Sequence, residues 1–280
     1  MTHDVPVSLT AQRLSLGYSG RVIVEEASTT LPAGAITAII GPNGCGKSTL
    51  LRGLARLLAP QHGVVHLDGR DLGAIPSREL ATKVGLLPQQ PAAPDGITVA
   101  DLIGRGRHPH QRWFRQWSAA DDAAVAAAMQ STGLTELAET PIDELSGGQR
   151  QRVWIALALA QDPEVMLLDE PTTYLDLAHQ LDVLGLLAEI NRVHRRTVVL
   201  VLHDLNMAAR YAHHLIAMRD GRLVAQGSPH DIITADMVGD VFGVEATVIT
   251  DPITHTPLVL PHPRVAATAP AVPEDRPPSR

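Results

Sequence analysis

The apolar positions of this chain fall into two patterns, nearly continuous runs and repeats at helical spacing. Nearly continuous runs fill residues 35–40, 165–168 and 197–202, and such runs are typical of strands buried on both faces of a parallel sheet. Between the second and third runs, residues 177–195 predict a helix from four apolar positions at helical spacing: Leu181, Leu184, Leu187 and Ile190. Strand, helix and strand therefore alternate, which favours an α/β fold.

Two other parts of the chain depart from this alternation. Residues 7–40 read as short strands separated by turns, which predicts a β-rich N-terminal part. Residues 91–160 lose the strand pattern and contain two stretches of helical composition, SAADDAAVAAAMQSTG and GGQRQRVWIALALAQ. We expect residues 1–90 and 161–260 to form one core, the latter with a short extension, and residues 91–160 to form an inserted helical subdomain. Proline and alanine in residues 261–280 predict a disordered tail.

Composition limits the location and the partners of the chain. Its 280 residues carry a formal net charge of -7, so the basic footprint of a protein that binds DNA or RNA is missing. The N-terminus lacks the charged and apolar regions of a signal peptide, and the longest apolar stretches fall short of the roughly 20 residues that span a bilayer. We expect a cytoplasmic protein without nucleic-acid partners, and a separate chain must cross any membrane that it serves.

Residues 41–48 read GPNGCGKS and match the phosphate-binding pattern G-x-x-x-x-G-K-S. Glycines let backbone N–H groups surround phosphate oxygens, and the following helix adds its positive N-terminal end. In this pattern Lys47 reaches the β- and γ-phosphates, Ser48 ligates Mg²⁺ and Thr49 meets the α-phosphate. The apolar run before the motif and the helical pattern after it disfavour a chance match. The predicted nucleotide contacts here are Gly41, Asn43, Gly44, Gly46, Lys47, Ser48 and Thr49.

The single cysteine of the chain, Cys45, lies inside this loop. A helix N-terminus lowers the pKa of a nearby thiol and makes it reactive, which is one interpretation of Cys45. The other interpretation is a small side chain turned away from the nucleotide. We favour the second interpretation.

Two carboxylates follow the apolar run of residues 165–168. Asp169 ends the predicted strand, where it is placed to hold Mg²⁺ directly or through water, and Glu170 is placed to polarise an attacking water. A solvated acidic turn is the alternative. The phosphate loop favours a ligand site, because both carboxylates are expected at the carboxyl edge of the sheet, where α/β folds bind ligands.

Residues 145–152 read LSGGQRQR. This segment resembles the signature motif of ATP-binding-cassette (ABC) proteins, and further motifs of that family occur in the family's order. Tyr18 matches the aromatic residue that stacks on adenine, and Gln89 matches the glutamine of the Q-loop, with Gln90 as the alternative register. The resemblance covers residues 7–260 and implies a P-loop NTPase fold, an ABC-type nucleotide-binding domain that uses ATP and Mg²⁺.

Two more motifs resemble those of ABC proteins. TTYLD, which ends at Asp176, matches the D-loop, and His203 in LVLHD matches the switch histidine. The resemblance implies that Glu170 is the general base, that His203 contacts the γ-phosphate and that Asp176 arranges the site of a partner copy. On their own, a histidine at a strand end is more often structural and Asp176 is placed to cap a helix. The implied catalytic residues are Glu170, His203, Gln89 and Lys47, and the implied metal ligands are Ser48, Gln89 and Asp169.

The residues of the signature motif have two interpretations. Ser146, Gly147 and Gly148 precede a helix that begins near Gln149, so they present a hydroxyl and backbone donors at a helix N-terminus. Taken alone, this turn is equally well explained as a helix cap. The family resemblance implies that two cassettes pack head to tail and that Ser146, Gly147, Gly148 and Gln149 of one copy close on the ATP of the other. ATP then joins the pair and hydrolysis releases it.

The family resemblance extends to one kind of ABC protein. The chain has one cassette and no long coiled-coil insertion, which disfavours the repair and translation branches of the family. ITVADLIGRGRHPHQ resembles the ATPases of importers for ferric siderophores and of their relatives for haem and vitamin B12, and DEPTTYLDLAHQLDVL and GVEATVITDPITHTPLVLP resemble the siderophore group more closely. The resemblance implies a motor subunit bound peripherally at the cytoplasmic face of the inner membrane. Its implied partners are an integral-membrane permease dimer, a second copy of the chain and, indirectly, a periplasmic or lipid-anchored substrate-binding protein.

Two alternatives to the siderophore assignment stay open. The cargo of the importer could instead be vitamin B12, haem or another small ligand, because the ATPase itself does not touch the cargo. A regulatory or binding ABC module, in which nucleotide acts only as a switch, is the non-enzymatic alternative.

Residues 104–117 concentrate arginine and aromatic residues in a chain of which only 3% is aromatic: Arg105, Arg107, Arg112, Trp113, Phe114, Arg115 and Trp117. Protein interfaces favour both residue types, so the segment is a candidate interface. A solvated helix whose aromatic side chains pack on the subdomain is an equal alternative. Binding of nucleic acid is disfavoured by the acidic charge of the chain.

Overall fold

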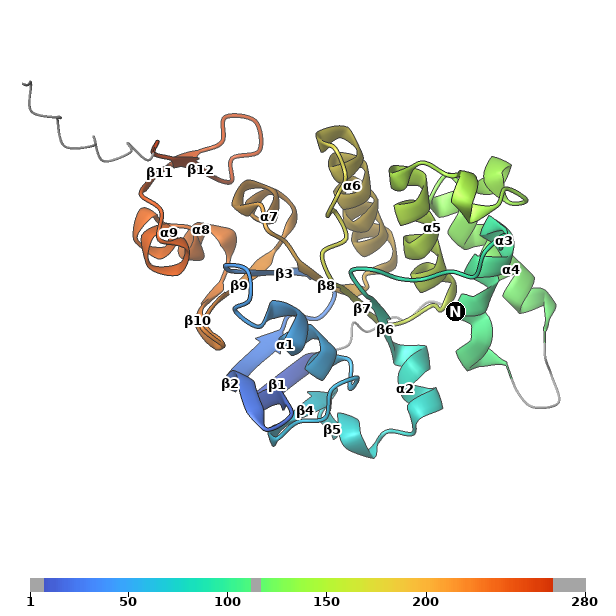
Figure 1. Cartoon of the computed structure of the whole chain (residues 1–280), viewed down its shortest axis with the longest axis horizontal. Coiled ribbons are helices and arrows are strands. Elements are labelled where there is room, and N and C mark those ends of the chain that lie inside the picture. The colour runs from blue at the N-terminus through green and yellow to red at the C-terminus, as the bar shows by residue number, and fades with distance from the viewer. Residues whose placement is uncertain (1–7, 112–116, 264–280) are drawn as a thin grey trace, which may run out of the picture.

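Two β-sheets form the core of the chain, in a computed structural model that describes residues 8–111 and 117–263 (Figure 1). The first sheet has the strand order β2-β1-β4-β5. Its antiparallel strands are β1 (Leu9–Tyr18), β2 (Arg21–Leu31), β4 (His62–Leu67) and β5 (Arg70–Asp71). The second sheet has the order β10-β9-β3-β8-β7-β6, and its strands are parallel except at the β9–β10 hairpin. These strands are β3 (Ile36–Ile40), β6 (Val84–Leu87), β7 (Val165–Leu168), β8 (Thr197–Val201), β9 (His214–Arg219) and β10 (Arg222–Gly227).

The second sheet is buried on both faces. One face, which includes Ile39 and Ile216, joins the first sheet and helix α1 (Lys47–Leu54) in a single apolar cluster. The opposite face, which includes Ile40 and Leu200, joins another apolar cluster with three helices: α5 (Gly147–Ala160), α6 (Leu177–His194) and α7 (Leu205–Tyr211). The prediction that the apolar runs are strands covered on both faces is therefore confirmed.

The first two strands are longer than the sequence pattern predicts. β1 and β2 have 10 and 11 residues and pair with each other along their length, although the register shifts within the pair. Arg13 in β1 and Glu26 in β2 have left-handed φ values of 44° and 47°. A left-handed residue inside a strand marks a bulge, which interrupts the alternation of apolar and polar positions. The predicted short strands are therefore pieces of one long, bulged pair.

Helices fill the segment between β6 and β7, where the composition of residues 91–160 predicts them. α3 (Val99–Gly104) and α4 (Ala119–Ser131) pack against α5, and short 3₁₀ turns lie between these helices: Arg105–His110, Thr135–Leu137 and Ile142–Glu144. Among the described residues of this segment, strand-like pairing is limited to one bridge between Thr98 and Pro141. The segment leads from the edge strand β6, which α2 (Ser77–Lys83) precedes, back to its neighbour β7.

The C-terminal part contains two helices and a hairpin. α8 (Pro229–Ile232) and α9 (Ala235–Phe242) are followed by the antiparallel strands β11 (Ala246–Thr250) and β12 (Pro257–Pro261). The hairpin packs on α7, where the Asn206 side chain accepts a hydrogen bond from the Val259 N–H at 2.7 Å and donates to the Val259 carbonyl at 3.2 Å. No helix in residues 8–111 and 117–263 is long and apolar enough to cross a bilayer. From residue 264 onward, the predicted tail lies outside the described residues.

Candidate active site

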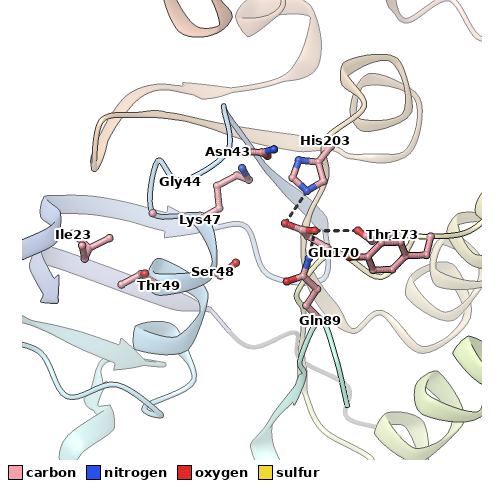
Figure 2. A pocket seen from close by; sticks show the side chains of 12 residues that line it. Ile23, Asn43, Gly44, Lys47, Ser48, Thr49, Gln89, Glu170, Thr173 and His203 are labelled. Carbon is pink, nitrogen blue, oxygen red and sulfur yellow. Dashed lines mark hydrogen bonds and ion pairs between the residues drawn. The ribbon is translucent and has the colours of Figure 1, made fainter. Parts of the chain in front are cut away.

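The phosphate loop connects the end of β3 to the start of α1 (Figure 2). Gly44 and Gly46 have left-handed φ values of 78° and 104°, which glycine adopts without steric cost. Gly41 needs to be glycine for space as well, because a Cβ atom on it would lie 2.2 Å from the carbonyl oxygen of Met218. The curled loop that the motif predicts therefore depends on glycines at positions where other side chains would be strained or would collide.

Lys47 begins α1 and is almost fully buried, with 5% of its surface exposed. Its Nζ donates hydrogen bonds to the carbonyl oxygens of Gly41 at 2.9 Å and of Pro42 at 3.0 Å. These carbonyls compensate the cost of burying an ammonium group. The loop thus holds a positive charge beside the N-terminus of a helix, an arrangement that suits phosphate oxygens.

Ser48 and Asp169 connect the phosphate loop to the carboxyl end of β7. The Ser48 hydroxyl donates a hydrogen bond of 2.8 Å to Oδ1 of Asp169. Burial raises the pKa of the Asp169 carboxyl, which is 3% exposed, and the hydrogen bond from Ser48 opposes that rise. The pair brings a hydroxyl and a carboxylate oxygen together at the carboxyl edge of the sheet.

Glu170 is the most connected polar side chain of the site (Figure 2). Its Oε2 accepts hydrogen bonds from Gln89 Nε2 at 2.5 Å and from the Thr173 hydroxyl at 3.0 Å, and its Oε1 lies 2.7 Å from His203 Nε2. Its backbone has a left-handed φ of 52°, a conformation that is uncommon for residues other than glycine and that often occurs at functional sites. Three separate loops thus hold one carboxylate opposite the phosphate loop. They also place Gln89, rather than Gln90, in contact with it.

A pocket of about 480 Å³ lies between these groups. Its lining residues are Ile23, Asn43, Gly44, Gly46, Lys47, Ser48, Thr49, Gln89, Glu170, Thr173, Tyr174 and His203. The structure therefore brings most of the predicted contacts from the phosphate loop together with Gln89, Glu170 and His203. Asp169 lies directly behind the pocket through its bond to Ser48.

Three lining residues were not predicted. Thr173 supports Glu170, whereas Tyr174 is 86% exposed and has a left-handed φ of 65°. Both belong to the TTYLD motif, and their position beside Asp176 in the sequence indicates that they lie near the site. Ile23 comes from β2, and nothing in its apolar surroundings distinguishes it as a lining residue.

Tyr18 lies beside this group rather than within it. It ends β1, is 42% exposed and does not line the pocket. Its hydroxyl accepts a hydrogen bond of 3.3 Å from Arg52 on α1. The ring is thus placed on the surface near the helix that follows the phosphate loop.

Cys45 is a packing residue of the loop. It is 5% exposed, and burial raises the pKa of its thiol. The helix N-terminus therefore does not produce a reactive thiolate here, because the cost of desolvating the charged form is the larger effect. The interpretation of Cys45 as a small side chain turned away from the nucleotide agrees with this burial.

The signature residues and Asp176 lie apart from the pocket. Ser146 caps α5: its Oγ accepts from the Gln149 N–H at 3.3 Å, and Gln149 Oε1 accepts from the Ser146 N–H at 3.0 Å. Asp176 caps α6 by accepting from the His179 N–H at 2.9 Å. Ser146, Gly147 and Asp176 are exposed. The structure therefore confirms both helix caps, and it does not place these residues at the phosphate loop of the same chain.

The arginine and aromatic segment is only partly described. Arg107 is 7% exposed and forms a buried ion pair with Asp121, with Nε 2.9 Å from Oδ1. Trp117 is 46% exposed, and its Nε1 donates to Asp122 Oδ1 at 2.6 Å. Arg112, Trp113, Phe114 and Arg115 lie outside the described residues. Arg107 is thus a structural arginine, while Trp117 packs on α4 and still presents part of its ring to solvent.

Comparison with known proteins identifies the family of this chain. The family described as ABC transporter matches residues 24–173. The chain belongs to this family. It is 52% identical over 266 residues to the ferric enterobactin transport ATP-binding protein FepC of Escherichia coli (strain K12), a match that covers 95% of this chain and 98% of FepC. It is 50% identical over 254 residues to the achromobactin transport ATP-binding protein CbrD of Dickeya dadantii (strain 3937), with coverages of 91% and 94%.

The fold is similar to that of solved ABC transporters. A structure assigned to the metal-chelate type of ABC transporter, in an inward-facing conformation, matches with a TM-score of 0.80 and 28% identity, over 92% of this chain and 98% of the matched chain. The matched family is one of ABC transporters, and the two relatives are transport ATP-binding proteins by name. The predictions of an α/β ABC cassette, of nucleotide binding and of a transport ATPase are therefore confirmed.

Proposed function

We propose that this chain is the ATPase subunit of an importer for ferric siderophores, in which ATP binding and hydrolysis drive uptake through a separate permease. The arrangement around Glu170 carries the enzymatic part of the proposal. A carboxylate held by Gln89, Thr173 and His203 faces a phosphate loop that contains Lys47. The cargo is proposed from the two relatives above, whose names specify transport of ferric enterobactin and of achromobactin.

The nucleotide would bind with its phosphates in the curled loop. Lys47 would exchange its two carbonyl partners for β- and γ-phosphate oxygens, and Thr49 would contact the α-phosphate, as in other phosphate loops. Tyr18 is exposed enough to stack on adenine, and Arg52 would keep its ring in place through the hydroxyl. Asn43, Gly44 and Gly46 would complete the loop contacts.

Mg²⁺ fits the oxygen atoms at the carboxyl edge of the sheet. Hydroxyl, carboxylate and amide oxygens are the ligands that this hard cation prefers, and it keeps several of its waters. Ser48 and Asp169 already lie within 2.8 Å of each other, and the Gln89 side chain lines the same pocket. When bound there, Mg²⁺ would neutralise phosphate charge. We propose that Ser48, Asp169 and Gln89 hold the ion.

Glu170 would act as the general base for hydrolysis. Its three partners orient the carboxylate toward the pocket, so that it can accept a proton from a water positioned beside the γ-phosphate. His203 would then hold the γ-phosphate and the water in place. Positioning and neutralisation of charge contribute most of the catalysis in phosphoryl transfer, and this arrangement provides both.

A second copy of the chain would complete the site. The pocket is lined by the phosphate loop and by the loops that carry Gln89, Glu170 and His203, whereas the signature residues of the same chain do not line it: Ser146, Gly147, Gly148 and Gln149. In a head-to-tail pair, these signature residues of one copy would close on the ATP held by the other. Asp176 would lie at the same contact. The backbone donors at the start of α5 suit the γ-phosphate for the same reason as those of the phosphate loop.

The remaining partners follow from the role of an import motor. Residues 1–90 and 161–260 would form the ATP-binding core, and residues 91–160 would form the helical subdomain that meets the permease, with the exposed part of Trp117 at this contact. The chain would lie peripherally at the cytoplasmic face of the inner membrane, bound to a permease dimer and served indirectly by a periplasmic or lipid-anchored binding protein.

Uptake of labelled cargo tests the proposal. Host cells that lack their own copy receive the wild-type chain, Glu170→Gln or the matched control Glu189→Gln, which changes an exposed glutamate paired with Arg192 on α6. We expect ferric siderophore uptake with the wild type and with Glu189→Gln, and its loss with Glu170→Gln, while labelled vitamin B12 uptake stays the same in all three. Loss of vitamin B12 or haem uptake instead would reassign the cargo. Absence of ATPase activity in the wild-type chain, even when its permease is present, would favour the alternative of a regulatory or binding ABC module.

A further inference from the structure

The imidazole of His179 lies between the signature turn, Ser146 to Gly148, and the D-loop carboxylate. His179 belongs to the first turn of α6, and α5 and α6 are in contact. A Cβ atom on Gly148 would lie only 2.1 Å from Cδ2 of His179 and 2.8 Å from its Nε2. The ring therefore occupies the space that a side chain at position 148 would need.

This contact gives a reason for the second glycine of the signature turn. Gly148 lies inside α5 and is not among the residues with positive φ, so its backbone conformation does not require glycine. The ring of His179 does require it, because any larger residue would push the ring away. Gly147 meets the same segment more loosely, since a Cβ atom on it would lie 4.0 Å from Cδ2 of Leu175. The signature turn and the D-loop segment thus pack directly on each other.

The other edge of the ring is bonded to Asp176. Nδ1 of His179 lies 2.7 Å from Oδ1 of Asp176, and the backbone N–H of His179 donates to the same oxygen at 2.9 Å. These two hydrogen bonds lower the pKa of the Asp176 carboxyl, so the side chain stays charged. A cap alone does not need a histidine. Asp204 caps α7 through the backbone N–H groups of Asn206 and Met207.

We infer that His179 is a positioning residue, which joins the D-loop carboxylate and the signature turn of one copy into a unit that meets the ATP of the second copy. The inference rests on the proposed head-to-tail dimer. The Nδ1–H of the ring orients Asp176, and the ring itself sets the position of Gly148. Displacing a group by about 1 Å from its productive geometry can reduce a rate roughly 100-fold, so a link of this kind affects turnover.

The test compares two replacements, one that keeps a hydrogen-bond donor near Asp176 and one that does not. In His179→Asn the side-chain amide keeps a donor close to the place of Nδ1, whereas His179→Ala removes both donor and ring. The full-length chain is assayed for ATP affinity with a fluorescent ATP analogue, and its ATPase rate is followed as a function of chain concentration, which reports the apparent affinity of the ATP-bound dimer.

We expect His179→Ala to keep the ATP affinity of the single chain, to weaken the apparent dimer affinity and to lower kcat about tenfold, the effect of one hydrogen bond to a charged group. His179→Asn should recover only the part of kcat that depends on the bond to Asp176, because it lacks the ring that packs against Gly148. Equal kcat in wild type and His179→Ala, or equal loss in both variants, would overturn the inference. A wild-type chain that keeps its full rate per copy at concentrations where light scattering shows a single copy with ATP bound would instead remove the dimer, and with it both the proposed mode of action and this inference.

A double substitution tests the packing of the ring. Gly148→Ala places a methyl group 2.1 Å from Cδ2 of His179, so it should lower kcat by displacing the ring as well as by altering the proposed contact with the ATP of the second copy. In the His179→Ala background the space is free, and the same Gly148→Ala change should cost much less. Such non-additivity is the expected signature of a direct contact. The same loss in both backgrounds, with unchanged thermal unfolding midpoints, would mean that the ring has no positioning role.

Discussion

The pocket around Glu170 and the face that carries Ser146 and Asp176 satisfy their polar groups in different ways. In the pocket, hydrogen bonds join distant segments: Glu170 is bonded to Gln89 and His203, and Ser48 to Asp169. On the face, each polar group bonds within its own helical turn, Ser146 with Gln149 and Asp176 with His179. The pocket therefore assembles only in the folded chain, whereas the face consists of local caps that remain available to another molecule.

Glu170→Gln would separate binding from hydrolysis in the pocket and has the largest expected effect. The amide keeps the shape of the side chain but cannot accept the proton of the attacking water, so turnover should fall by roughly 10²- to 10⁴-fold while ATP still binds. Phosphate release and nucleotide binding measure the two properties. Thr173→Val, which removes one of the hydrogen bonds to Glu170, is the control and should have a much smaller effect. Vigorous hydrolysis by Glu170→Gln would exclude Glu170 as the base.

Lys47→Ala should weaken ATP binding itself. The substitution removes the buried ammonium from the loop, and a hydrogen bond to a charged group contributes about 1.5–3 kcal/mol, so the affinity for ATP should fall roughly 10- to 100-fold. Titration with a fluorescent ATP analogue measures the change. Cys45→Ala, in the same loop but directed into the core, should bind ATP like the wild type. An unchanged ATP affinity in Lys47→Ala would mean that the phosphates bind outside this loop.

Ser146→Ala should lower turnover without changing ATP binding by the single chain, and so distinguishes the face from the pocket. Loss of a capping hydroxyl costs about 1 kcal/mol of stability, and loss of one contact to the partner's phosphate lowers turnover roughly tenfold. ATP affinity of the single chain should not change, because Ser146 does not line its pocket. Thr234→Ala removes an equivalent cap from α9 and should lower stability without lowering turnover. Equal turnover in the two variants would leave Ser146 as a cap and nothing more.

The sequence predicts those parts of the site whose residues are neighbours along the chain. Lys47 and Ser48 stand beside glycines that make the loop, and Asp169 and Glu170 follow an apolar run that has to be a buried strand. Parallel strands bring such ends to one edge, so their proximity could be expected before the structure was known. The same argument correctly predicted the α/β fold, because the continuous runs and the helical repeat are local patterns.

The parts that could not be predicted depend on contacts between segments. The bulges at Arg13 and Glu26 disguise two long strands as shorter ones, since a bulge breaks the period that identifies a strand. The ring of His179 against Gly148 joins two helices, and neither motif contains the other residue. In the sequence Thr173 is one residue of the TTYLD motif, and only the structure shows that its hydroxyl donates to Glu170. Sequence patterns therefore indicate which residues form a site more readily than they indicate which residues hold it in place.

The C-terminal hairpin lies outside both the pocket and the face. Substitutions in it show whether it affects either of these two regions. Asp251 accepts hydrogen bonds from the backbone of Ile253 and from Arg210 on α7, which hold the pKa of its carboxyl well below the usual range. A lowered pKa in the folded state stabilises the fold above the unfolded value of about 3.9, and this stabilisation is lost as the pH falls through the folded value. Asp251→Asn should therefore lower the thermal midpoint at pH 7, and its difference from the wild type should shrink in acid.

Arg222→Ala is the matched control, because it removes an exposed pair with Glu25 and exposed pairs contribute little to stability. Asp251→Asn should also hydrolyse ATP at the wild-type rate at temperatures where both proteins are folded. α7 begins two residues after His203, however, and the hairpin holds that helix at both Asn206 and Arg210. A lower rate without a lower midpoint would therefore mean that the hairpin positions His203 through α7, and the pocket would then extend into a region that its motifs do not include.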